Sequence, residues 1–280
     1  MSSIQKFAHH AMATKFEMFV ASDSNDNAKH VAVELWNEID RLENELSRFR
    51  EGSDIWRLNR SQTNTWVRFG LDAFECLKQA LDISAATNGA FDPTIGPLFR
   101  YWRECQDNQV KVDPKVLSEA KKAVGWQKII LDEDSISVKM LADHMQLDLG
   151  GVGKGYALDT VAELLLDDWE MNEVMLSAGG STVLVLDQPV DEVWDVGLGG
   201  LDWKEPLLLN HSAVSGSGMG VQGEHIINPR TGNPVPKQNR VWALAKTAAT
   251  SDALSTAFMV MNQEEINTYL LENPETQIFC

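Results

Sequence analysis

The hydrophobic and polar positions of this chain follow a helical period in four segments. Residues 27–46 carry apolar side chains three and four positions apart over charged partners, which predicts an amphipathic helix. Residues 71–87 repeat this pattern and run into Asn88-Gly89, a pair typical of a helix end. Two further helices are expected over residues 156–169 and 251–261.

Short apolar runs between these segments predict strands. They cover residues 15–21, 126–131, 135–139, 145–149, 173–176 and 182–186. Residues 47–59 and 90–97 are too polar, or too rich in proline and glycine, for regular structure. Residues 212–218 (SAVSGSG) lack a nucleophile motif and are interpreted as a close-packed loop near a ligand. The pattern predicts one α+β domain over residues 1–280, with mixed, mostly antiparallel sheets and flanking helices.

The charge balance is strongly acidic, with 24 Lys and Arg against 41 Asp and Glu and a formal net charge of -17. This imbalance argues against nucleic acid or an anionic membrane as a partner, because both bind clustered cations. A nucleotide ligand remains compatible, since a local magnesium ion can offset its phosphates. No apolar run approaches the roughly 20 residues of a membrane span, and residues 1–10 show no secretory pattern. A cytoplasmic protein is expected, unless an export signal has been removed.

The glycine-rich segment at residues 148–156 (DLGGVGKGY) has the features of an anion site. A strand that runs through glycines into a helix lets backbone amides approach an anion closely, and the helix N-terminus attracts it. Lys154 would add a positive charge on a phosphate, and Asp148 would accept a hydrogen bond from a ligand. The spacing differs from that of a P-loop, and a merely structural turn is an equal alternative.

Asp252 and Thr256 are four positions apart in the last expected helix, so their side chains share one face. A carboxylate and a hydroxyl, completed by carbonyls and water, form the oxygen environment that magnesium prefers. The alternative is that Asp252 caps the N-terminus of this helix.

His225 precedes two apolar residues and a Pro-Arg-Thr-Gly turn, so a strand is expected to deliver its imidazole to the mouth of a loop. An imidazole with an unperturbed pKa near 6.5 is suited to act as a general base toward a hydroxyl. The alternative is an ordinary polar residue without a catalytic role.

These segments occur in one order, with residues 12–14 (MAT) and 88–94 (NGAFDPT) before them. Together they resemble the ApbE-type FAD:protein FMN transferases over about residues 12–261. The resemblance implies a single, T-fold-like α+β domain with FAD in a cleft. It implies that the residues in contact with FAD are Met12, Phe49, Ala90, Phe91, Asp92, Asp148, Lys154 and Ile226. His225 resembles the family's catalytic base, and Mg²⁺ is expected between the pyrophosphate and Gly151, Asp252, Ser255 and Thr256, with Gly151 binding through its main-chain carbonyl.

The resemblance also implies the reaction. FMN would pass from FAD to a Thr or Ser hydroxyl of an acceptor flavoprotein, and AMP would leave. Two alternatives remain, an FAD pyrophosphatase that releases FMN and AMP, and a non-catalytic flavin-binding protein. The chain departs from the family pattern at Val214, where a threonine is usual, at Asn228, where an aspartate is usual, and at Phe49, where tyrosine is frequent.

Overall fold

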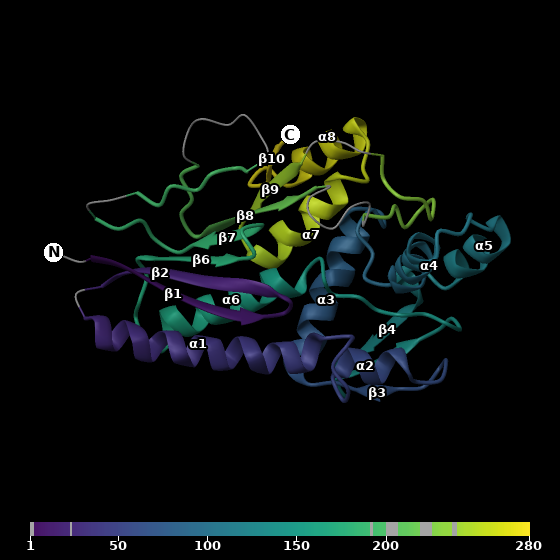
Figure 1. The fold of residues 1–280 in the computed structure, drawn as a ribbon, viewed down its shortest axis with the longest axis horizontal. Helices are drawn as coiled ribbons and strands as arrows, with labels where there is room; N and C mark the ends of the chain where they lie inside the picture. The colour runs from purple at the N-terminus through teal and green to yellow at the C-terminus, as the bar shows by residue number, and fades with distance from the viewer. Residues whose placement is uncertain (1–2, 23, 191–192, 200–206, 219–225, 237–239) are drawn as a thin grey trace.

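The computed structural model describes residues 3–22, 24–190, 193–199, 207–218, 226–236 and 240–280. Within this part of the chain, a large antiparallel sheet is covered by helices, and a smaller sheet with its own helices lies at one end (Figure 1). The expected α+β class with mostly antiparallel sheets and flanking helices is confirmed. No helix of the described residues combines the length and the apolar character needed to cross a membrane.

The large sheet has the order β1-β2-β6-β7-β8-β9-β10, and every neighbouring pair is antiparallel. Its strands are β1 (Ser3–Ala11), β2 (Thr14–Ser22), β6 (Val174–Ala178), β7 (Thr182–Val185), β8 (Ser212–Ser217), β9 (Val241–Ala245) and β10 (Gln277–Phe279). Alternation fixes which face is buried, as in β2, where Phe16, Met18 and Val20 point into the core. The opposite face is covered by a second cluster that includes Trp194 and Trp242.

Three helices pack on the main core face of this sheet, namely α1 (Asn25–Leu46), α6 (Gly153–Asp167) and α7 (Ala248–Phe258) (Figure 1). The apolar stripe of α1 is buried as its spacing predicts, and Ser24 caps the helix by accepting the Asn27 amide. Two further helices, α3 (Leu71–Ala86) and α8 (Gln263–Glu272), also contribute side chains to this core.

The smaller sheet has the order β3-β5-β4 and lies at the end of the molecule away from the N-terminus (Figure 1). Its strands are β3 (Val67–Arg68), β4 (Ile129–Asp132) and β5 (Ser137–Met140). The helices at this end are α2 (Asp54–Asn59), α4 (Gly96–Asp107), α5 (Pro114–Lys122) and the short 3-10 turn η1 (Trp126–Lys128).

The structure corrects three local predictions. Residues 145–149 are not a strand, because only Gln146 among them forms a β-bridge, with Ile95. The amide and the carbonyl of Leu147 are hydrogen-bonded to the side chain of Asn59 and not to a neighbouring strand. The expected loop at residues 47–59 contains α2, which Ser53 caps by accepting the Trp56 amide. The expected loop at residues 212–218 contains β8, whose small side chains let α7 pack closely against it.

Gly155 sets the distance between α6 and α7. A Cβ atom at this position would lie 2.2 Å from the carbonyl oxygen of Ala248, a backbone atom that cannot move aside. We expect Gly155→Ala to lower the free energy of unfolding by about 3 kcal/mol or more, measured by urea denaturation. Gly153→Ala is the matched control, because its Cβ would meet neighbours only at 3.9 Å. Equal stability of the two variants would contradict this account of the packing.

Candidate functional site

The N-terminal turn of α6 and the second turn of α7 meet through an ion pair. Lys154 Nζ lies 3.0 Å from Asp252 Oδ2 and also donates to the carbonyl of Gly150 at 3.1 Å. Both side chains are largely withdrawn from solvent, at 22% and 8% exposure. A lysine and an aspartate that are 98 positions apart in the sequence therefore form one charged centre.

Asp252 is not the cap of its helix. The N-cap of α7 is Thr247, whose side chain accepts the Thr250 amide, and Asp252 lies one turn further on. The capping alternative is therefore wrong, and the carboxylate is free to face Lys154. Thr182 of β7 adds a hydroxyl whose oxygen lies 3.5 Å from Asp252 Oδ1.

A row of hydroxyl groups continues from Asp252 along α7 to β8. Ser217 Oγ lies 2.8 Å from Ser255 Oγ and 3.1 Å from Thr256 Oγ1. Ser255 Oγ also donates to the carbonyl of Asp252. Of these hydroxyl groups, that of Ser217 is not among the site residues predicted from the sequence. Its only sequence signal is a serine between two glycines at residues 216–218, which was interpreted as a loop.

The glycine turn lies directly against this cluster. A Cβ atom on Gly151 would stand 3.1 Å from Phe91 Cε2 and 3.7 Å from Thr256 Oγ1, so only a residue without a side chain leaves the space between them open. The first turn of α6 has no side-chain cap, and its first amide, that of Gly153, donates to the carbonyl of Leu149. Asp148 Oδ1 fixes the turn by accepting the Gly150 amide at 2.9 Å.

Residues 90–92 are buried behind the glycine turn. The Asp92 carboxylate accepts hydrogen bonds from the Thr94 amide and hydroxyl and from the Trp126 amide. Burial raises the pKa of Asp92 above its ordinary value, while these three donors act in the opposite direction. The carboxylate therefore holds this segment in place. Phe91 is the member of the segment that reaches Gly151.

Phe49 and Met12 lie at the ends of two other loops. Phe49 is 76% exposed and is contacted by the guanidinium of Arg48, 4.5 Å from its ring centre. The same Arg48 reaches Asp148 Oδ2 at 3.3 Å, which connects this loop to the glycine turn. Met12 and Ala13 form the two-residue turn between β1 and β2 with positive φ angles of 49° and 56°, a conformation that side chains disfavour.

The segment around Ile226 is tied to the end of α3. Ile226 is buried, and Arg230 donates to the carbonyls of Asn88 and Thr87 while it pairs with Glu265 at 2.6 Å. His225, the expected base, lies outside the described residues. The structure thus brings together Gly151, Lys154, Asp252, Ser255 and Thr256, with Phe91 and Asp148 beside them. Ile226 belongs to the same hydrophobic core cluster as Phe91, and Met12 packs against that cluster.

Asp159 of α6 caps α7 from the side. Its carboxylate accepts the amides of Ala248 and Ala249 at 2.7 and 2.8 Å. Burial raises the pKa of Asp159 to about 7, against an ordinary value near 4. Between these two values the folded state holds a proton that the unfolded chain has released, so this group lowers stability as pH rises from about 4 to about 7.

We expect the free energy of unfolding to fall less between about pH 4 and pH 7 in Asp159→Asn than in the wild-type protein. In the wild-type protein the raised pKa of Asp159 lowers the free energy of unfolding by at most about 4 kcal/mol over this pH range. The measurement is the free energy of unfolding in urea at several pH values, with Asp167→Asn at the exposed end of the same helix as the control. An Asp159→Asn variant with the wild-type slope would show that this carboxyl titrates normally in the folded protein.

The oxygen atoms at this centre suit a magnesium ion that is also bound by water and by substrate phosphates. The centre offers one carboxylate and several hydroxyls, and the described residues contain no group of three His, Cys, Asp or Glu side chains that would hold a metal by themselves. Magnesium usually binds through one or two carboxylates and completes its shell with water and substrate phosphates. The residues present therefore fit the ion in the presence of a phosphorylated ligand.

The comparisons with known proteins point to one family. The sequence matches the model of the ApbE family over residues 12–280. The chain belongs to the ApbE family. An FAD:protein FMN transferase from Vibrio cholerae is 28% identical over 259 residues, which cover 82% of this chain and 74% of that protein. One from Haemophilus influenzae is 25% identical over 240 residues, with coverage of 79% and 69%. Like these two relatives, the chain is an enzyme of the transferase class.

Solved ApbE structures share the fold. The crystal structure of an ApbE protein from Thermotoga maritima is similar with a TM-score of 0.82 at 26% identity, over 99% of this chain and 93% of that one. The flavin transferase ApbE from Vibrio cholerae has a TM-score of 0.87 at 20% identity, over 99% and 93% of the two chains, which is a likeness of fold. The resemblance inferred from the motifs is confirmed.

Proposed function

We propose that this chain is an FAD:protein FMN transferase that uses magnesium to move FMN from FAD to a Thr or Ser hydroxyl of an acceptor flavoprotein, releasing AMP. The proposal treats residues 1–280 as one flavin transferase domain. The observation that carries it is the Lys154–Asp252 pair between the glycine turn and the hydroxyls of α7. This arrangement offers positive charge and amides to a pyrophosphate on one side and oxygen ligands to a cation on the other.

The glycine turn and Lys154 bind the pyrophosphate in this proposal. The contacts of Lys154 with Asp252 and with the Gly150 carbonyl keep its ammonium at the start of α6, where we propose that the phosphate binds. Asp252, Ser255, Thr256 and the Gly151 carbonyl would hold magnesium, which would supply positive charge to the pyrophosphate oxygens. Phe91 and Asp148 border the same turn and would position the nucleotide.

The reaction exchanges one phosphorus–oxygen bond for another. The acceptor hydroxyl oxygen attacks the phosphorus of the FMN half, and the bond from this phosphorus to the bridging oxygen breaks. AMP leaves with that oxygen and both electrons of the bond. We propose that His225 takes the proton of the hydroxyl, because a hydroxyl with a high intrinsic pKa needs a base within hydrogen-bond reach. The remaining contribution of the protein is positioning and electrostatic stabilisation.

Analysis of the nucleotide products tests the proposal against its two alternatives. The chain is incubated with FAD and magnesium, with and without a peptide that carries a Ser/Thr-Gly-Ala-x-x-Thr acceptor sequence. Transfer predicts AMP release that depends on the peptide, with no matching free FMN. Equal free FMN and AMP without the peptide would instead support an FAD pyrophosphatase. Intact FAD under both conditions would support a flavin-binding protein.

We expect FAD to bind more tightly than riboflavin, by about tenfold or more. The contacts from Lys154, the start of α6 and the metal address the pyrophosphate, which riboflavin lacks, and charge-assisted hydrogen bonds are the stronger class. Fluorescence titration in the presence of magnesium measures both affinities. Equal affinities would contradict the assignment of the glycine turn as the pyrophosphate site.

A further inference from the structure

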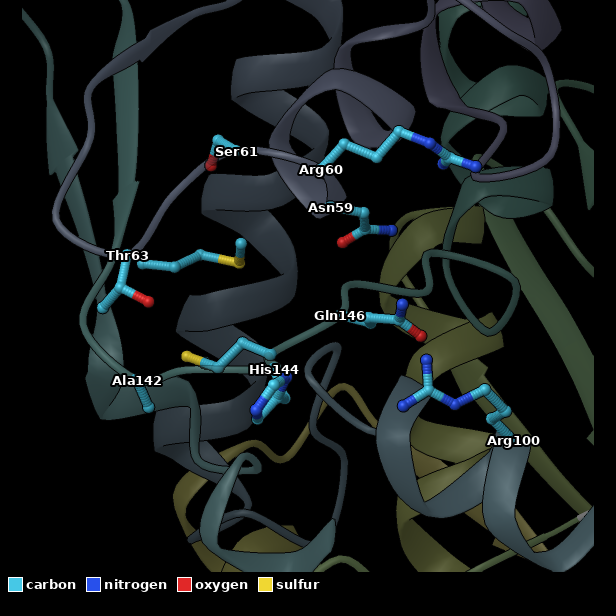
Figure 2. A pocket seen from close by; sticks show the side chains of 10 residues that line it. Asn59, Arg60, Ser61, Thr63, Arg100, Ala142, His144 and Gln146 are labelled. Atoms are coloured by element: carbon cyan, nitrogen blue, oxygen red, sulfur yellow. The ribbon is translucent and has the colours of Figure 1, made fainter.

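A polar pocket lies at the end of the molecule that carries the smaller sheet. Its cavity of about 190 Å³ is formed by the end of α2, by α4 and by the segment that follows β5 (Figure 2). The lining residues are Asn59, Arg60, Ser61, Thr63, Arg100, Met140, Ala142, His144, Met145 and Gln146. None of them belongs to the glycine turn or to the Lys154–Asp252 cluster.

Two arginines of this pocket have no acidic partner among the described residues. Arg57 and Arg103 lie on the same two helices and pair with Asp54 and Asp107, as is expected in a chain with an excess of acid. Arg60 and Arg100 form no such pair, although both line the cavity. Since arginine presents five donors and no acceptor, two guanidiniums at one cavity favour an anionic ligand.

Other groups of the pocket are available donors as well. The side chains of His144 and Gln146 make no hydrogen bond with any described residue, and both line the cavity (Figure 2). Asp143, which precedes His144 in the sequence, is not among the lining residues, and its carboxylate accepts a hydrogen bond from the hydroxyl of Thr63. The accessible groups therefore match the oxygens of an anion.

The frame of the pocket is fixed before any ligand arrives. Asn59 donates to the carbonyl of Leu147 and accepts its amide, which holds the segment after β5 against α2. The start of α4 contacts the same segment through the Gly96 amide and the Gln146 carbonyl. The guanidinium of Arg60 lies 4.1 Å from the ring centre of Trp56. A site whose backbone frame is already held in place loses less entropy on binding.

We propose that this pocket is a binding site for a small phosphate-bearing metabolite, separate from the flavin site. The planar guanidiniums of Arg60 and Arg100 bind the phosphate oxygens, and Gln146 and His144 supply further donors. The cavity exceeds the size of the phosphate alone, so a small organic group attached to the phosphate fits beside Met140 and Met145. The inference does not rest on the proposed transferase reaction.

Calorimetric titration with inorganic phosphate and with glycerol phosphate tests the site, at constant ionic strength and with magnesium present, first without FAD and then with FAD saturating. We expect saturable binding to one site, weakened by about tenfold or more in the Arg60→Gln, Arg100→Gln double variant. Arg103→Gln, on the same helix as Arg100, should bind as wild type does. FAD affinity should be the same in all three proteins, because none of these residues lies in the glycine turn.

Three results would overturn the proposal. These are the absence of saturable phosphate binding, equal binding by the double variant and wild type, and loss of phosphate binding when FAD is added. The last result would place the phosphate in the nucleotide site. Tighter binding of glycerol phosphate than of inorganic phosphate supports an organic ester as ligand, and the reverse order overturns that part of the proposal. The thermal midpoint of each variant verifies that the exposed substitutions leave the fold intact.

Discussion

Asp252→Ala is expected to abolish FMN transfer together with its dependence on magnesium. Asp252 supplies the only carboxylate of the described cluster, and a magnesium site retains few protein ligands. The substitution also leaves the ammonium of Lys154 without its partner in a site that is largely withdrawn from water. The measurement is the rate of acceptor flavinylation over a series of magnesium concentrations.

Thr256→Ala is the graded control for this prediction. It removes one neutral oxygen of the same helix face, which water can replace, so a smaller loss is expected. Asp252→Asn keeps the size of the side chain and separates the loss of charge from the loss of packing. Wild-type turnover by Asp252→Ala in the presence of a chelator would contradict the assignment of this residue to the metal.

His225→Ala is expected to lower transfer by roughly 10²- to 10⁴-fold and to leave FAD affinity nearly unchanged. A base that acts on the acceptor hydroxyl stabilises the transition state more than the bound cofactor. Only neutral imidazole accepts the proton, so the wild-type rate should rise with pH through the titration of the histidine. The measurement is single-turnover transfer at saturating FAD and acceptor over a range of pH.

Asn228 provides the matched control for the histidine. Its side-chain oxygen accepts the amides of Arg230 and Thr231, a role that an aspartate also performs. Asn228→Asp should therefore preserve the turn while adding a negative charge three positions from His225, which moves the rise of the rate to higher pH. A His225→Ala rate equal to wild type would assign the proton to another residue or to the acceptor itself.

Periodicity predicted the elements that bury a regular face. The apolar stripe of α1 and the alternating buried residues of β2 could be predicted because each pattern repeats over several helical turns or residue pairs. The alternation of Met145, Leu147 and Leu149 was misleading, since burial of every second residue also suits an irregular segment held by the side chain of Asn59. The small residues of β8 form no apolar pattern that would predict a strand. Their place in the sheet depends on the close approach of α7, which the local sequence does not show.

The site was predictable only as separate motifs. The sequence alone could not show that Lys154 meets Asp252, because this contact depends on how α6 and α7 pack around Gly155. The sequence left two roles open for Asp252, metal ligand or helix cap. The structure excludes the cap because Thr247, five residues earlier, is the N-cap of α7. The contribution of Ser217 arises from the sheet, since β8 must first be placed beside α7.

The mass of the acceptor after one turnover tests the central claim most directly. A peptide with the acceptor sequence and a twin with valine in place of its last threonine are each incubated with this chain, FAD and magnesium, and their intact masses are measured. We predict that the threonine peptide gains one covalently bound FMN, that the valine twin gains none, and that a chelator prevents the gain. An unchanged threonine peptide, with FAD consumed or intact, would contradict the transferase assignment.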